Sequence, residues 1–308
     1  MKKSCILLII CFAFIKVNAQ QLPQYSNYMI NDYALNPAIG GSNNFFEAKS
    51  NNRYQWIGIT DAPRTYILSV EGPLKNLHMG VGGLVFTDIV GPTRRTGLYG
   101  SYAYHLKLSD KIKLSMGLNV GILQFMVDGS KITKHDPLDP ILSDGIQYSY
   151  LPDFGVGVYA YSTDHRWYVG ASVPQIGQNK IKFFDNTVST LSKLSTHMYV
   201  TAGYKFDVGD NFKIEPSTCL KYVKPAPFQF DLGVRGIYKD KIWLGAAFRY
   251  LDAVSVMVGY TMQENITFAY SYDFTTTNIK KYSTGTHELM IGIKFHKTPE
   301  SKSAVKMQ

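Results

Sequence analysis

The residues between 228 and 295 read as five consecutive strands in which apolar and polar side chains alternate with period two. In one of them, Ile242, Leu244 and Phe248 share one face, while Trp243 and Arg249 share the other. The other segments follow the same rule, with one apolar face and one face that is small, polar or charged. Since successive side chains of a strand point to opposite sides, this pattern predicts an all-β chain whose sheet has two chemically different faces.

Two architectures explain such a sheet. In a soluble sandwich the apolar face meets a protein core, whereas in an outer-membrane barrel it meets lipid and the polar face lines the lumen. The strands are about ten residues long, which is the length that a tilted strand needs to cross the hydrocarbon layer. Their apolar rows often end in Tyr or Phe, as interfacial girdles do. Charged residues such as Asp231, Arg235 and Lys294 fall on the polar face. We therefore expect the barrel.

The connections between the expected strands support the same choice. About fourteen antiparallel strands are expected near residues 45–58, 64–73, 77–87, 94–107, 111–126, 151–162, 165–175, 196–208, 211–223, 228–238, 241–251, 253–261, 265–275 and 286–296. Every second connection is short, and the long ones, 127–150, 176–195 and 276–285, all fall in the other set. A transmembrane outer-membrane β-barrel with short periplasmic turns and longer external loops has this asymmetry. An even strand count then places both chain ends on the periplasmic side.

The N-terminus resembles a cleaved export signal. Lys2 and Lys3 precede an apolar run, and the sequence Val-Asn-Ala at 17–19 resembles a small-residue cleavage site. We expect a signal peptide at 1–19, an N-terminal periplasmic or plug segment at 20–44, the β-barrel at 45–296 and a flexible periplasmic tail at 297–308. Residues 20–44 lack the strand pattern, so a plug in the lumen, a place in the periplasm and a partner contact all stay open.

The distribution of charge argues against a nucleic-acid-binding protein, and the cysteine content argues against an internal disulfide. The formal net charge is +9, but the Lys and Arg residues are scattered through strands and turns, so we expect no nucleic-acid partner. A membrane surface rich in phosphorylated lipid explains a mildly basic chain equally well. Two of the three Cys residues lie in the leader, and Cys219 is expected to be a small wall residue that faces the lumen.

The chain resembles the PorP/SprF family of outer-membrane proteins of the type IX secretion system. The matching stretches are QYSNYMINDYALNPAIGGS, NRYQWIGITDAPRTYILSVEGPL, GVGGLVFTDIVGPTRRTGLYGSYAYHLKLS, LPDFGVGVYAYS, WYVGASVPQI and the run 199–295. The resemblance implies a barrel in the outer membrane that delivers or anchors an exported surface protein, such as a large gliding adhesin, through the C-terminal domain of that client. It also implies a periplasmic partner that belongs to the secretion system or is linked to peptidoglycan, and it brings no catalytic residues.

Candidate partner-binding residues combine positions that carry the resemblance with charged residues on the inner rows of the strands. They are Tyr25, Tyr28, Asn36, Pro37, Arg53, Gln55, Trp56, Arg235 and Arg249. We expect the C-terminal segment of a client to bind at the external mouth or in the lumen, so that replacing Arg235 and Arg249 together weakens client retention. Glycines on the inner rows, such as Gly233, Gly245, Gly259 and Gly292, either leave room for an inserted segment or mark curvature of the wall.

We expect neither an enzyme nor a cofactor or metal site. The seven His residues are scattered, and the sequence has no Gly-x-Ser-x-Gly motif and no metal-spaced His/Cys cluster. Asp136, Asp139 and Asp144 could offer oxygen ligands to calcium, but their spacing fits an acidic surface loop better. Two other functions remain as alternatives: a plugged 14-strand transporter for hydrophobic small molecules, and an outer-membrane hydrolase.

Overall fold

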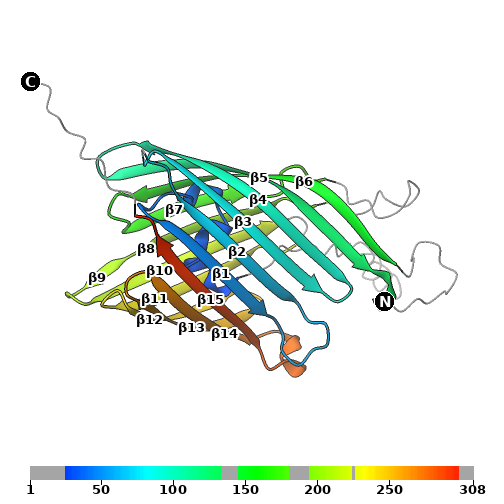
Figure 1. The fold of residues 1–308 in the computed structure, drawn as a ribbon. Helices are drawn as coiled ribbons and strands as arrows, with labels where there is room; N and C mark the ends of the chain where they lie inside the picture. The colour runs from blue at the N-terminus through cyan, green and yellow to red at the C-terminus, as the bar shows by residue number, and fades with distance from the viewer. Residues whose placement is uncertain (1–24, 76, 133–144, 180–193, 224–225, 298–308) are drawn as a thin grey trace, which may run out of the picture.

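The protein is a closed antiparallel β-barrel (Figure 1). The computed structural model describes residues 25–75, 77–132, 145–179, 194–223 and 226–297. Neighbouring strands in the chain pair side by side, and the first strand closes the barrel against the last, with Phe46 opposite Phe295. In the described ranges, no helix has the length and apolar character needed to cross a membrane. The expected signal peptide at 1–19, the distal part of the tail and the Asp136–Asp144 loop fall outside these ranges.

The strands run the length of the barrel wall. They are β1 (Phe46–Tyr54), β2 (Arg64–Pro73), β3 (Met79–Val90), β4 (Thr93–Lys107), β5 (Ile112–Asp128), β6 (Ile146–Ser162), β7 (Trp167–Val173), β8 (His197–Tyr204), β9 (Phe206–Val208), β10 (Phe212–Val223), β11 (Gln229–Tyr238), β12 (Ile242–Arg249), β13 (Ala253–Met262), β14 (Ile266–Thr275) and β15 (Thr286–Phe295). Within the described ranges, five single-turn 3₁₀ helices accompany them: η1 (Ser26–Met29), η2 (Asp32–Ala34), η3 (Pro37–Ile39), η4 (Gly129–Lys131) and η5 (Asn278–Lys281).

The wall contains fourteen strand positions, which confirms the expectation from sequence. The sheet has fifteen labelled strands, but β8 and β9 both pair with β10 and are separated only by Lys205, so together they fill one position. Two boundaries differ most from the expectation: β1 ends at Tyr54, not near 58, and β6 begins at Ile146, not near 151, where its first residues pair with the end of β5. The period-two alternation of β6 extends back into residues 146–150, which the sequence had assigned to the loop 127–150. Ile146, Tyr148 and Tyr150 all face outward.

The two faces of the wall differ in chemistry as the period-two pattern predicts. On β12, Leu244 is 65% exposed on the outside, whereas Trp243 and Arg249 are buried inside. The outer rows of the other strands are likewise Leu, Val, Ile, Phe and Tyr, while the buried polar side chains come from the inner rows. A lipid-facing exterior and a packed polar interior follow, which is the transmembrane barrel arrangement.

The connections at the two ends of the barrel differ in length. We call the end where β1 begins and β15 finishes the near end, and the opposite end the far end. The near-end connections are the short segments 74–78, 108–111, 163–166, 209–211, 239–241 and 263–265. The far end carries the longer connections 55–63, 129–145, 174–196 and 276–285 beside three short ones. In bacterial barrels of this type, short turns face the periplasm and long loops face outward.

A charge placed on the lipid-facing side of β13 tests this orientation of the wall. Val256 is exposed in the middle of the strand, and Met262 is exposed at its end. We expect Val256→Arg to lower the free energy of unfolding by about 2–4 kcal/mol, because a basic side chain near midplane must leave water. Met262→Arg is the matched control and should cost about 0–1 kcal/mol near the interface. Urea titration of the folded band on unheated gels measures both, and equal costs would contradict the assigned faces.

Candidate functional site

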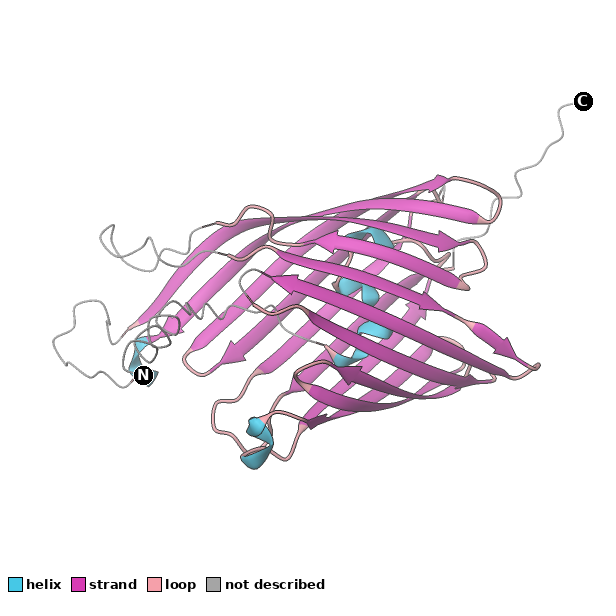
Figure 2. Cartoon of the chain, turned by 180° about the vertical axis from the view of Figure 1, so that it is seen from behind, coloured by secondary structure: helices cyan, strands magenta, loops and turns pink. Residues whose placement is uncertain are grey.

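Residues 25–42, which we call the plug, lie inside the barrel. They form η1, η2 and η3, the short helices enclosed by the strands in Figure 2. η1 contacts β14 and β15, η2 contacts β2, and η3 contacts β4, β5 and β6, so the plug crosses the lumen from one side of the wall to the other. Three single turns leave many backbone groups without a partner in their own helix, and the wall must satisfy them. Of the three placements left open by the sequence, the described part of the segment occupies the lumen.

Five charged wall residues hold the start of the plug; we call them the anchor network: Arg53, Arg249, Asp231, Asp273 and Glu288. Their side chains are at most 3% exposed. Arg53 donates to Asp273 at 2.8 Å and to Glu288 at 2.9 Å. Arg249 lies 3.4 Å from both Asp231 and Asp273. These buried charges neutralise one another together with Lys221, which pairs with Asp231 at 2.7 Å, and Asp252, which pairs with Arg249 at 2.9 Å.

The plug enters the anchor network through Ser26. Its backbone N–H donates to Glu288 at 2.8 Å, and its hydroxyl donates to Asp273. The same hydroxyl oxygen accepts from Arg53 at 2.7 Å and from Arg249 at 3.1 Å. The backbone N–H of Asn27 adds a second bond to Glu288 at 3.1 Å. A single serine thus joins both arginines to the acids, and the start of the plug is part of the buried network.

Hydrogen bonds, most of them to uncharged groups, hold the other end of the plug. The Asn36 side chain donates to the backbone carbonyl of Val158 at 3.0 Å and caps η3 by accepting from Ala38 N. The carbonyl of Gly40 lies 3.1 Å from Nε2 of His105, and Gly41 N donates to Glu71 at 2.7 Å. Pro37 starts η3, where a missing N–H costs nothing. The Asn-Pro pair therefore forms the cap that fixes the plug against β6.

Glycines on the inner rows make room for the plug. A Cβ on Gly80 would overlap the Gly40 carbonyl, and one on Gly117 would overlap the backbone of Ala38. A Cβ on Gly233 would come within 2.5 Å of the Met29 side chain. Of the inner-row glycines singled out from sequence, Gly233 contacts the plug, whereas Gly259 is covered by Trp243 of the neighbouring strand. Close backbone approach, not curvature, explains these plug-facing positions.

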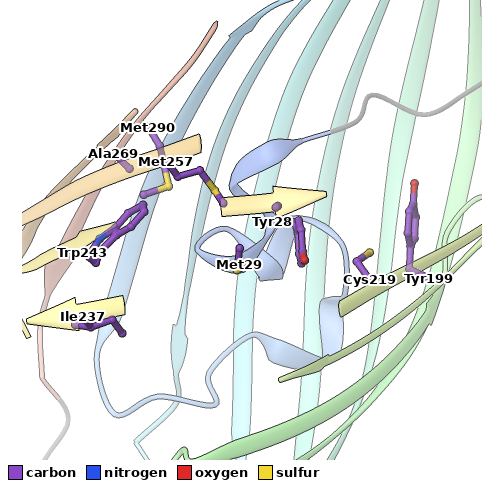
Figure 3. Packing of buried hydrophobic residues seen from close by; sticks show 10 residues of the cluster. Tyr28, Met29, Tyr199, Cys219, Ile237, Trp243, Met257, Ala269 and Met290 are labelled. Carbon is purple, nitrogen blue, oxygen red and sulfur yellow. The ribbon is translucent and has the colours of Figure 1, made fainter. Parts of the chain in front are cut away.

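Apolar side chains fill the space between the plug and β8–β15. Tyr28 and Met29 of the plug form one buried cluster with wall residues (Figure 3). The wall members are Tyr199, Cys219, Ile237, Trp243, Ala247, Met257, Ala269 and Met290. Cys219 is fully buried there, as its expected position on an inner row implies. Burial of this cluster adds a hydrophobic contribution to the charged and polar contacts of the plug.

Burial also sets the ionisation of plug residues. It raises the pKa of Tyr33 to about 12, with a smaller opposing effect from its hydrogen bond with Ser101. Burial likewise raises the pKa of Asp32, against the attraction of Lys49. The Tyr33 phenol is therefore neutral at physiological pH, and its hydroxyl is used in the hydrogen bond with Ser101.

The structure brings six of the nine candidate partner-binding residues together. Tyr25, Tyr28, Asn36 and Pro37 belong to the plug, and Arg53 and Arg249 belong to its anchor network. The remaining three lie elsewhere. Arg235 pairs with Glu215 at 2.8 Å and stacks on Trp243, while Gln55 and Trp56 lie in a far-end connection. Client binding by these residues stays a prediction.

Sequence reasoning missed the acids that complete the site. Asp273 and Glu288 carry the bonds to Ser26 and Asn27, and Glu71 carries the bond to Gly41. Their inner-row positions were visible in the alternation, but nothing local showed that they face the plug, which lies 247 and 261 residues before Asp273 and Glu288 at Ser26 and Asn27, and 30 residues before Glu71 at Gly41. Among the described residues, no group of three or more His, Cys, Asp or Glu side chains is arranged to hold a metal ion.

The far-end connections 55–63 and 276–285 form a joined surface. Ile57 N donates to Gly285 O, and Thr284 N donates to Ile57 O, both at 2.9 Å. Trp56 N also donates to the Thr286 hydroxyl at 3.2 Å. Ile57 and Tyr282 are 40% and 75% exposed on this surface, which we call the far-end surface. It presents apolar groups to water at the rim, outside the strands.

Comparison with known proteins places this barrel in a family. Residues 17–293 match the family model of the type IX secretion system membrane protein PorP/SprF. No curated protein sequence matches the chain. The Ralstonia pickettii toluene transporter TbuX superposes with a TM-score of 0.52 and 12% identity, over 85% of this chain and 92% of that one. The CymD monoaromatic hydrocarbon channel gives 0.51 and 13%, over 92% and 95%. These structures show a shared barrel fold, and the family match shows that the chain belongs to the PorP/SprF family of type IX secretion system membrane proteins.

Proposed function

We propose that this protein is a non-enzymatic outer-membrane barrel that delivers or anchors one specific exported surface protein, such as a gliding adhesin, and contacts a periplasmic partner of the secretion system. The plug carries this proposal. Because the chain's own N-terminal segment crosses the lumen and is bonded on both sides, the rims and not the lumen are available to a partner. A barrel built in this way suits attachment better than conduction.

The far-end surface is the contact that we assign to the client. Its two connections brace each other through backbone hydrogen bonds, so Ile57 and Tyr282 are held in place although they are exposed. Rigid aromatic and aliphatic anchors at a rim cost little conformational entropy when they bind. The near end, where the barrel begins and finishes, is assigned to the periplasmic partner, since short turns face the periplasm in this class.

Surface shaving of intact cells tests the proposal. Deletion of the gene is expected to remove one exported protein from the protease-accessible surface by at least about ten-fold, and the same protein should co-purify with the tagged barrel. The double variant Ile57→Ala and Tyr282→Ala should lose that co-purification and the surface display, because it removes both apolar anchors. Leu74→Ala with Leu108→Ala is the matched control, since both residues are exposed at the near end.

Two outcomes would overturn the proposal. In one, the deletion leaves every exported protein on the surface at its normal amount. In the other, the control pair disrupts co-purification as strongly as the far-end pair, which would mean that client binding does not use the far-end surface.

The runner-up function is a plugged transporter for hydrophobic small molecules. Uptake of a labelled fatty acid into liposomes that contain the purified barrel separates the two. We expect uptake equal to that of empty liposomes, because the plug is bonded to both sides of the wall. Uptake that exceeds the empty-liposome rate several-fold would favour transport instead.

A further inference from the structure

A cavity of about 80 Å³ lies beside the plug and shares Tyr199 with the buried cluster of Figure 3. Its plug side is formed by Tyr25, Tyr33 and Ala34, and its wall side includes Phe86 and Tyr99. One water molecule needs about 10–15 Å³ measured in this way, and a dry engineered cavity of about 150 Å³ holds benzene. The space therefore fits several waters or one small organic molecule.

Two of the four tyrosines in the lining, Tyr33 and Tyr99, use their hydroxyl groups in hydrogen bonds within the protein. The Tyr33 hydroxyl is bonded to Ser101, and the Tyr99 hydroxyl donates to Asp153, both at 2.7 Å. Phe86 and Tyr99 are stacked with their ring centroids 6.1 Å apart. Because these hydroxyls are already satisfied, the tyrosines contribute apolar area to the cavity.

The cavity also offers no free charge. Asp153 is the acidic residue in its lining, and both carboxylate oxygens are used: one accepts from the Tyr99 hydroxyl and the other from Phe154 N at 2.8 Å. A cationic ligand would have to displace these bonds, and an anionic ligand would meet a carboxylate. A neutral ligand is therefore favoured.

Gln175 places a buried polar side chain in the lining. Gln175 is 4% exposed and lines the cavity, and its side-chain amide has no hydrogen-bond partner among the described residues. Its backbone is held in the left-handed region at a φ of 59°, and its carbonyl accepts from Thr196. A buried amide without a partner costs free energy, so its presence indicates a molecule that completes it.

We propose that this cavity binds a small neutral molecule of about six heavy atoms, with an apolar body against the aromatic rings and one hydroxyl or carbonyl group on the Gln175 amide. This site is separate from the rim contacts assigned to the client and from the anchor network. The proposed function does not use the cavity. A negative result in the client experiment would therefore not argue against this site, and a negative result in the ligand experiment would not argue against the proposed function.

Trifluoroethanol is a suitable probe, because it joins a trifluoromethyl group to one hydroxyl and partitions weakly into micelles. The experiment uses the full-length barrel in non-ionic detergent and follows the fluorine NMR linewidth of the probe, with protein-free micelles as the blank. We expect clear broadening with the native chain. Ala34→Phe, which fills the cavity from the plug side, should reduce binding at least about ten-fold. Gln175→Met keeps the volume and removes the amide, so binding should weaken about two- to ten-fold.

Ala48→Phe is the matched control, because it adds the same side chain on the opposite, lipid-facing rows of β1. It should bind the probe as the native chain does. Retention of the compact band on unheated gels shows that each variant is folded. The proposal fails if the native chain does not broaden the probe, if Ala34→Phe broadens it equally, or if Gln175→Met binds it with unchanged affinity.

Discussion

Replacing Arg53 by Met is expected to free the start of the plug and to lower the free energy of unfolding by about 3–5 kcal/mol. Arg53 bonds Asp273, Glu288 and the Ser26 hydroxyl, and its side chain is 2% exposed. Met retains most of the volume but none of the donors, so it leaves two buried carboxylates short of a cation. Faster hydrogen exchange in residues 25–35 and a lower urea midpoint for the folded band would record the two effects.

Arg166→Met is the matched control for that experiment. Arg166 also pairs with two acids, Asp164 at 3.2 Å and Asp207 at 2.8 Å, but it is 52% exposed at a near-end turn. Exposed pairs contribute about 0–1 kcal/mol, and we expect no change in plug exchange. Adding Asp273→Asn to Arg53→Met should recover part of the loss, because it removes one of the uncompensated charges. Equal exchange in the two arginine variants would show that the network does not hold the plug.

The second large effect is expected from Gly80→Val combined with Gly117→Val. The added side chains would occupy the space of the Gly40 carbonyl and the Ala38 backbone, which cannot rotate away as a flexible side chain could. Each overpacked position costs about 1–3 kcal/mol, and the cheapest relief is withdrawal of η3 from the wall. We expect rapid hydrogen exchange across residues 36–42 and an increase in single-channel conductance in planar bilayers, since the lumen loses its filling.

Gly100→Val provides the comparison for the glycine pair. It lies on the same strand face as outward residues of β4, and a Cβ there meets nothing within 4 Å. A valine facing lipid should leave both conductance and plug exchange at native values. If Gly100→Val opened the barrel as the inner pair does, wall strain and not plug displacement would explain the effect.

The barrel could be predicted from sequence because its information is local. Alternation within each strand assigns the lipid-facing rows, as Leu244 against Trp243 illustrates, and the lengths of successive connections separate the two ends. Neither feature depends on a distant residue. Fourteen strands and an outer-membrane location follow from these patterns and agree with the family and the shared fold.

The interior could not be predicted in the same way. The plug has no periodicity, and its single-turn helices exist only because wall groups such as Glu288 and Val158 accept its N–H groups or bond its side chains. Arg235 of β11 and Arg249 of β12 lie on the inner rows of two paired strands and look equivalent in sequence. However, Arg235 pairs with Glu215, whereas Arg249 joins the anchor network. The available signal was the inner-row glycines at 80, 117, 157 and 233, which indicated an inserted segment without naming it.

The bonds from Ser26 and Asn27 to Glu288 span 262 and 261 positions, so the earliest described part of the chain depends on its final strand. Such distant contacts form late, because the loop between them must close first. During biogenesis Ser26 and Asn27 therefore have no carboxylate to bind until β14 and β15 have inserted, although the later part of the plug contacts β2, β4, β5 and β6. A chain truncated before β15 would lose the closing strand pair and the partner of these two residues together. Protection of the backbone N–H groups of residues 26 and 27 from hydrogen exchange therefore indicates that β15 has joined the barrel.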